Sequence, residues 1–211
     1  LITNYSKIHN SISIADFGSG YGGTSRFLYK KLIDDFTNIN IDCYDISKEN
    51  CIVAEEKNIK ENININIFNV SFLNINLTKK YDIIYSEDAF IHINKREEIF
   101  KEINKHMLKN GLLIFSDIIL TDNCDYKEIQ EVYDRINIKN IETTESYINL
   151  AKKYNLKIVK EVEYKQSMLY HYQNILDLVE NKKENEKIIK GLLSWIKHIK
   201  LNNITTKLFV F

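Results

Sequence analysis

The sequence lacks several features that would point to particular classes of protein. It contains no proline, one tryptophan and three cysteines in 211 residues. Because Cys43, Cys51 and Cys124 are odd in number and form no C-x-x-C pair, we expect free thiols in a reducing, cytoplasmic compartment and no metal site. We also expect no signal peptide, and no apolar run is long enough to span a bilayer.

Charge of either sign is not in excess. The chain has 29 lysines and arginines against 29 aspartates and glutamates, so its formal net charge is zero. We therefore expect no general attraction to nucleic acid or to an anionic membrane. The length fits one α/β domain over residues 1–211, and its function must depend on a local site. The oligomeric state stays open.

Glycine is scarce too, and four of the six glycines lie in one short stretch. Residues 15–23 read ADFGSGYGG, after an apolar alternation at 11–15 that predicts a strand and before a helical pattern at 24–36. Such a strand-to-helix turn lets bare backbone approach a ligand and points helix N–H groups toward it. The turn suits a nucleotide-like cofactor, although glycines kept only for turn geometry would look the same.

Two cofactor classes use such a turn, and the glycine spacing alone does not separate them. Gly18, Gly20 and Gly23 satisfy the dinucleotide pattern G-x-G-x-x-G, and Asp45 stands where a ribose-binding acid is expected. Asp16, two residues before the first glycine, would face a pyrophosphate badly but suits a cofactor with a cationic amine. The resulting D-x-G-x-G-x-G pattern resembles that of S-adenosylmethionine-dependent methyltransferases.

The remaining periodicities predict alternating strands and helices. Strands are expected at 11–15, 39–44, 63–69, 81–85, 112–116, 156–164 and 205–211. Helices are expected at 24–36, 48–60, 95–108, 147–154, 168–181 and 185–200. This order predicts a doubly wound, mostly parallel α/β sheet with ligands over the C-terminal strand ends. The resemblance implies a Rossmann-like class I methyltransferase sheet with an antiparallel last strand and a helical insertion near the C-terminus, and we expect an N-terminal lid to be absent.

The same resemblance implies which residues bind S-adenosylmethionine. Asp16 and the glycine turn would hold its methionine end, and Asp45 would accept hydrogen bonds from the ribose hydroxyls, unless Asp45 only closes an Asx-turn. Ser71 would face the adenine, at a position where the family usually has an aspartate. The complete set implied for the cofactor is Asp16, Gly18, Ser19, Gly20, Tyr21, Gly22, Asp45, Ile46, Ser71, Phe72 and Glu87.

A second informative stretch, SEDAFIH at 86–92, follows the predicted fourth strand. Asp88 and His92 are four residues apart, so one helical turn would place both on the same face. The carboxylate would orient an amine, and a neutral imidazole would take the proton that the amine nitrogen loses. The alternative is that His92 only caps the helix that starts near Asn94.

Two motifs together resemble those of the small-molecule amine methyltransferases, which include phosphoethanolamine enzymes and the glycine, sarcosine and dimethylglycine enzymes. They are ADFGSGYGGTSRFL at 15–28 and YSEDAFIHI at 85–93. The later segments EVYDRINIKNIETTESYINLAKKYNL, QSMLYHYQNI and KGLLSWI resemble the sarcosine/dimethylglycine branch more closely. The resemblance covers nearly the whole chain from Ile14 onward.

The choice of branch also has a physical side. Arg135 suffices for the carboxylate of an N-methylated glycine, unless it only forms a surface ion pair with Glu131 or Asp134. A phosphoethanolamine enzyme would place a tyrosine directly after Asp117, where this chain has Ile118.

Three aromatic residues complete the predicted acceptor site. Tyr147, His171 and Tyr172 match aromatic positions of the betaine-forming family, and tyrosine rings can stabilise a developing quaternary ammonium. Ordinary helix packing is the alternative for each. The sequence therefore predicts methyl transfer from S-adenosylmethionine to a small amine, sarcosine or dimethylglycine, with phosphoethanolamine or a larger lipid or isoprenoid as alternative acceptors. A catalytically silent, cofactor-binding scaffold is the alternative of another class.

Overall fold

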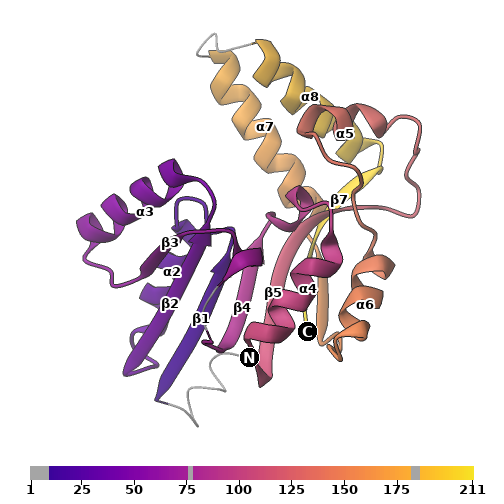
Figure 1. Ribbon diagram of the computed structural model, residues 1–211. Helices are drawn as coiled ribbons and strands as arrows, with labels where there is room; N and C mark the ends of the chain where they lie inside the picture. Colours follow the sequence, from indigo (N-terminus) through magenta and orange to yellow (C-terminus); the bar gives the residue numbers. More distant parts are fainter. Residues whose placement is uncertain (1–9, 76–77, 182–185) are drawn as a thin grey trace. The chain divides into compact units, whose positions relative to one another are not determined.

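The computed structural model describes residues 10–75, 78–181 and 186–211 (Figure 1). By their internal contacts these residues divide into two compact units. Unit 1 comprises the described residues up to Ala89 together with Glu97–Phe115, and unit 2 comprises Phe90–Arg96 and the described residues from Ser116 onward. The strand β5 (Met107–Leu120) passes from one unit into the other.

Seven strands form one sheet in the order β3-β2-β1-β4-β5-β7-β6. The strand bounds are β1 Ser11–Phe17, β2 Asn38–Asp45, β3 Asn66–Asn69, β4 Tyr81–Glu87, β5 Met107–Leu120, β6 Lys160–Glu163 and β7 Ile204–Val210. The pairs β1–β2, β1–β4 and β2–β3 are parallel, whereas β6 and β7 are antiparallel. The predicted mostly parallel sheet with an antiparallel last strand is confirmed.

The helices follow the predicted alternation. Their bounds are α2 Gly23–Leu32, α3 Lys48–Glu61, α4 Arg96–His106, α5 Gln130–Ile136, α6 Thr144–Lys153, α7 Lys165–Asn181 and α8 Glu186–Lys200, with short 3-10 turns η1 Phe72–Asn74 and η2 Phe90–His92. Helices α7 and α8 lie between β6 and β7 in the sequence and pack against each other (Figure 1), which confirms the helical insertion near the C-terminus.

The core of unit 1 follows from the alternation of its strands. Ile12 and Ile14 of β1 and Ile41 of β2 lie on one face of the sheet, where Leu28 and Leu32 of α2 cover them. Burial of such aliphatic side chains is the main stabilising contribution to this layer, at about 25 cal/mol per Å² of apolar surface removed from water. The layer holds the strand that carries the glycine turn.

Several boundaries in unit 1 differ from those predicted, among them those of β5, which runs from Met107 to Leu120 where a strand at 112–116 was expected. Helix α2 ends at Leu32, four residues early. Strand β3 begins at Asn66, three residues late, and Asn62 with its left-handed backbone (φ 51°) ends α3. Helix α4 ends at His106, so Gly111 is not a helix stop but lies within β5. A Cβ on Gly111 would lie 3.1 Å from the Asp82 carbonyl oxygen of β4, so this glycine permits close approach of neighbouring backbones.

Unit 2 has a separate core. Ile118 of β5, Ile129, Met168 of α7, and Trp195 and Ile199 of α8 are buried together in one cluster. Helix α6 begins three residues earlier than predicted because the Thr143 hydroxyl accepts the Ser146 N–H and the Ser146 hydroxyl accepts the Thr143 N–H, a capping box. Strand β6 covers only the second half of its predicted range.

Candidate functional site

The carboxylate of Asp16 is buried at the C-terminal end of β1, with 3 % of the residue exposed. Its Oδ2 accepts hydrogen bonds from Ser25 Oγ of α2 at 2.7 Å and from the Tyr85 hydroxyl of β4 at 2.6 Å. The Cys43 thiol of β2 donates to Ser25 Oγ at 3.0 Å. Oδ1 accepts no hydrogen bond from the described part of the chain. Helix α2 and strand β4 therefore hold this predicted cofactor residue, and β2 supports the serine.

Burial dominates the electrostatics of Asp16. It raises the pKa of the carboxyl from 3.8 to about 7, against the hydrogen bonds from Tyr85 and Ser25, which lower it. The nearby carboxylates of Glu87 and Asp45 raise the pKa further. No cationic side chain among the described residues compensates the charge, so the ionised form is costly until a cation arrives.

The glycine turn lies directly beside Asp16. Gly18 has φ +80°, and a Cβ on it would lie 2.4 Å from the Ala89 side chain, so only glycine fits between the turn and the segment after β4. The buried Ser19 Oγ has no hydrogen-bond partner among the described residues. Gly22, at φ +67°, caps α2 without a side-chain hydrogen bond, which leaves first-turn N–H groups for a ligand.

Arg26 of α2 holds this turn through the Tyr21 carbonyl, a role that the sequence did not reveal. Its Nη1 donates to the Tyr21 carbonyl at 2.7 Å, and its Nε lies 3.3 Å from a Glu61 carboxylate oxygen. The Tyr21 ring itself is half exposed and lies against Lys57, with 5.4 Å from Nζ to the ring centroid. Arg26 follows the glycines by one helical turn, which is the signal that could have indicated it.

Asp45 ends β2 next to the turn. Its Oδ2 accepts the Gly20 N–H at 2.8 Å, and its Oδ1 accepts the Ser47 N–H at 2.8 Å. The second contact is the Asx-turn named above as the alternative for Asp45. Oδ1 also accepts a hydrogen bond from Asn50 Nδ2 at 3.3 Å. A carboxylate has about four acceptor positions, so these three contacts leave capacity for a ribose hydroxyl. Ile46 beside it is 76 % exposed, a flat apolar surface at the end of the strand.

Ser71, predicted to face the adenine, and the other predicted cofactor residues Phe72 and Glu87 have different surroundings. Ser71 Oγ accepts the Leu73 N–H and caps η1. Phe72 is buried, with its ring stacked on Phe17 at 4.9 Å between centroids, so it packs in the core of unit 1. Glu87 at the end of β4 is exposed and accepts a hydrogen bond from Thr24 Oγ1 at 2.6 Å.

The predicted pair Asp88 and His92 is not built on one helical turn. Asp88 has a left-handed backbone (φ 49°), and the 3-10 turn η2 begins only at Phe90. The expectation of a shared helical face is therefore wrong, because a positive φ interrupts the helical path between them. Both residues are exposed, Asp88 in unit 1 and His92 in unit 2, and their chemical roles stay predictions.

A buried polar cluster in unit 2 was only partly predicted. Asp117 accepts hydrogen bonds from the Ile91 N–H and from the hydroxyl of the fully buried Tyr147. Arg96, 3 % exposed, donates through Nη2 to the carbonyls of Ile91 and Asn140. Its Nε and Nη1 have no partner among the described residues. Burial and then the Asp117 charge raise the pKa of Tyr147, and Arg96 opposes this.

The remaining acceptor residues are spread over unit 2. The exposed His171 and the half-buried Tyr172 lie next to each other on α7, with Tyr172 stacked on Trp195 of α8 at 5.6 Å. This stacking is the helix packing named as the alternative for Tyr172. The side chain of Arg135, in α5, lies outside the described residues.

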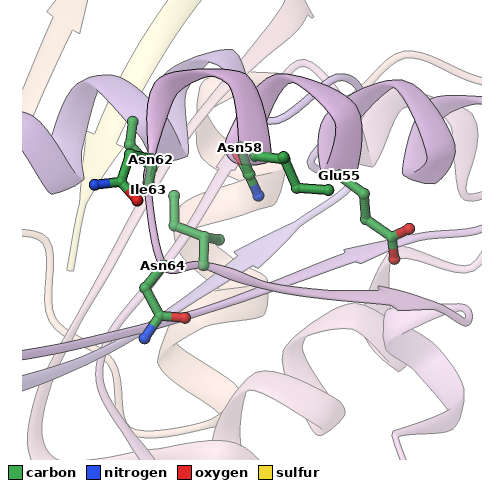
Figure 2. A pocket seen from close by; sticks show the side chains of 7 residues that line it. Glu55, Asn58, Asn62, Ile63 and Asn64 are labelled. Carbon is green, nitrogen blue, oxygen red and sulfur yellow. The ribbon is translucent and has the colours of Figure 1, made fainter.

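A cavity of about 500 Å³ lies elsewhere in unit 1, where α3 gives way to β3 (Figure 2). Its lining residues are Glu55, Asn58, Ile59, Asn62, Ile63, Asn64 and Ile65. None of the predicted site residues lines it. Within residues 10–75, 78–181 and 186–211 no three His, Cys, Asp or Glu side chains gather as metal ligands, and none of the helices described there has the length and apolar character to cross a bilayer.

Comparison with known proteins finds related domains and sequences. Residues 15–113 match the methyltransferase domain family. The sarcosine/dimethylglycine N-methyltransferase of Aphanothece halophytica is 26% identical over 174 residues, which cover 79% of this chain; the chain spans 60% of that relative's length.

Solved structures agree on the fold. A crystal structure from Galdieria sulphuraria, described as a sarcosine dimethylglycine methyltransferase, matches with a TM-score of 0.89 and 26% identity over 100% of this chain and 79% of that one. The phosphoethanolamine N-methyltransferase 2 of Haemonchus contortus, in complex with phosphomonomethylethanolamine and S-adenosylhomocysteine, matches with a TM-score of 0.78 and 16% identity over 99% of this chain and 50% of that one. The methyltransferase domain match at residues 15–113 and the class I fold shared with these solved structures support an S-adenosylmethionine-dependent methyltransferase.

Proposed function

We propose that this protein transfers a methyl group from S-adenosylmethionine to the nitrogen of a small amino acid, sarcosine or dimethylglycine. The observation that carries the proposal is the buried Asp16 carboxylate, which has only neutral hydrogen-bond donors and lies beside the glycine turn. A ligand with a cationic amine would compensate the charge of a carboxylate so placed. The names of the relatives, sarcosine/dimethylglycine N-methyltransferases among them, point to the acceptor.

The residues of unit 1 fit this cofactor. The missing Cβ at Gly18 leaves backbone that a ligand can approach, and the Ser19 hydroxyl needs a partner. The first-turn N–H groups of α2 suit the carboxylate of the methionine part. Asp45 would accept from the ribose hydroxyls, and the exposed Ile46 would cover one face of the adenine.

The acceptor would be positioned by residues near η2 and in unit 2. When bound, the cofactor supplies an electrophilic methyl group, and catalysis comes mainly from holding the amine in line with it in a dry site. Asp88 would orient the ammonium form of the amine. His92 would accept the proton from a secondary amine as its nitrogen attacks, whereas a neutral tertiary amine has no proton to lose.

Two arginines are candidates for the acceptor's carboxylate. Arg135 was predicted from the sequence. Arg96 is favoured by its structure, because two of its guanidinium nitrogens are buried without an acceptor among the described residues. A carboxylate satisfies such a pair of donors in a bidentate way. Ile118, buried in the core of unit 2, argues against a phosphoethanolamine site that needs a tyrosine there.

The experiment offers labelled S-adenosylmethionine with glycine, sarcosine, dimethylglycine and phosphoethanolamine in parallel, with products identified by mass. S-adenosylhomocysteine binding is measured by calorimetry on the same preparation. Label in the products of sarcosine or dimethylglycine supports the proposal. Label only in phosphoethanolamine overturns the acceptor assignment, and absence of cofactor binding supports the scaffold alternative.

Replacement of His92 by alanine separates the acceptors. We expect a loss of about 100-fold or more in kcat on sarcosine and a much smaller loss on dimethylglycine, because only the secondary amine needs a base. Asp88→Ala is the companion variant and should raise KM for both acceptors. Equal losses of kcat on the two substrates in His92→Ala would contradict the base assignment.

A further inference from the structure

Three oxygen atoms around Asp16 form a closed triangle. Asp16 Oδ2 lies 2.7 Å from Ser25 Oγ and 2.6 Å from the Tyr85 hydroxyl oxygen, and those two oxygens lie 2.6 Å from each other. Each distance is that of an O–H···O hydrogen bond, so each side of the triangle requires its own hydrogen atom.

The number of hydrogen atoms in the triangle depends on Asp16. Ser25 and Tyr85 supply one each, and burial raises the pKa of Tyr85 far above its usual range, so its hydroxyl stays protonated. The Cys43 thiol hydrogen points at Ser25 from outside the triangle. With Asp16 ionised, two hydrogens serve three sides and one side has none. With Asp16 protonated, every side has one.

The surroundings act in the same direction. The titratable and charged groups that face Asp16 are Cys43 and Asp45 on β2 and Tyr85 and Glu87 on β4, while α2 contributes a neutral hydroxyl. Among the described residues none of these groups is cationic. Burial raises the pKa of Asp16 to about 7, so the two forms are close to balance near neutral pH.

We propose that Asp16 holds a proton in the cofactor-free protein and releases it to solvent when the ammonium group of the cofactor binds at this carboxylate, with Tyr85 and Ser25 as the positioning residues that set how readily the proton leaves. The O–H bond of the carboxyl breaks, its electron pair stays on the carboxylate, and the ammonium remains cationic. The inference rests on the proposed cofactor, since only a cationic ligand would favour the ionised form.

The proposal predicts how cofactor affinity varies with pH. Only the ionised fraction of Asp16 is competent to bind, so the apparent Kd is multiplied by the inverse of that fraction. Between pH 5.5 and pH 7 the ligand's α-amino group, with an ordinary pKa of about 8, stays protonated. Affinity should therefore rise by about 15-fold over this interval.

Isothermal titration calorimetry with S-adenosylhomocysteine tests the proposal. Titrations at one pH in two buffers of different ionisation enthalpy give the number of protons released on binding. We expect about half a proton per ligand at pH 7 and close to one at pH 6. Binding without proton release would overturn the inference and leave the proposed function intact, whereas no binding at any pH would remove the cofactor assignment itself.

Variants assign the proton to Asp16. Tyr85→Phe removes two sides of the triangle, so proton release at pH 7 should depart from half a proton per ligand, and the affinity at pH 7 should change with it. Ser25→Ala should likewise change the proton release if Tyr85→Phe does not fold. The matched control is Tyr81→Phe. It removes the hydroxyl that donates to another buried carboxylate, Asp42, and should release the same number of protons as the wild type.

A purely structural role for Tyr85 would weaken binding equally at all pH values. Unchanged proton release in both Tyr85→Phe and Ser25→Ala would assign the proton to another group and overturn the inference.

Discussion

Two buried carboxylates on neighbouring strands of unit 1 have opposite surroundings. Asp42 of β2, 1 % exposed, accepts from the Tyr81 hydroxyl at 2.7 Å, from Asn66 Nδ2 at 2.8 Å and from the Lys79 ammonium at 2.5 Å. Asp16 of β1 is also hydrogen-bonded to a tyrosine, but its other donor is a serine hydroxyl.

The two carboxylates differ in whether a cationic side chain compensates their charge. The Lys79 ammonium compensates the charge of Asp42 whether or not a ligand is present. Asp16 has no such cation among the described residues, and Glu87 and Asp45 add negative charge around it. A buried charge without a partner is costly, which proteins accept where a ligand supplies the partner. Asp42 therefore stabilises the sheet, and Asp16 is the carboxylate available for a cationic ligand.

The largest difference is expected from matched asparagine substitutions. Asp42→Asn should lower the free energy of unfolding at pH 7 by about 3 kcal/mol, because the buried carboxylate loses its charge-assisted hydrogen bonds from Lys79, Tyr81 and Asn66. Asp16→Asn should leave that free energy unchanged or raise it, since it removes a buried charge that lacks a cation. Urea denaturation of the two variants makes the comparison, and equal losses would break it.

The pH dependence of stability should differ by a smaller amount. Burial raises the pKa of Asp16 from 3.8 to about 7, so the folded protein binds this proton more tightly than the unfolded chain does. Its contribution is fully present below the unfolded-state pKa and is lost as pH rises through about 7. Relative to Asp16→Asn, the cofactor-free wild type should lose about 2 kcal/mol between pH 5 and pH 7, measured by urea denaturation. A difference that does not change with pH would refute the raised pKa.

The smallest effect is expected from removing Lys79, the cation that pairs with Asp42. Lys79→Met should cost about 1 kcal/mol in the wild type, since the Lys79 side chain is a third exposed and its interaction with Asp42 is partly screened by solvent. In the Asp42→Asn background the same change should cost little. A double-mutant cycle gives the coupling energy, and additive losses would mean that Lys79 does not act through Asp42.

Much of the fold was readable from local patterns. The glycine-rich stretch predicted the strand-to-helix turn, and the apolar alternations predicted the order of the strands in the sequence. Ends of elements were less accessible, because they depend on single contacts. Asn62 ends α3 by its left-handed backbone, and Thr143 starts α6 by a capping box. Gly111 looked like a helix stop and instead lies where two strands approach closely.

The candidate site was predictable in part. Asp16 and Asp45 could be identified because each stands at a fixed distance from the glycines or at the end of a strand. Ser25, Tyr85 and Arg96 were missed as polar partners, since no sequence spacing indicates contacts across strands and helices. The helical pairing of Asp88 with His92 was wrong, because spacing alone cannot reveal the positive φ of Asp88.

The sequence by itself determined the glycine turn, the order of strands and helices and the position of Asp16 at the end of β1, since these depend on neighbours along the chain. Only the tertiary structure decided what surrounds Asp16. Ser25 lies 9 residues from Asp16 in the sequence, and Tyr85 lies 60 residues from Ser25 and 69 from Asp16. Among the described residues no cation contacts Asp16. The charge state of a carboxyl depends on burial and on every group within a few ångströms, and folding alone brings those groups together.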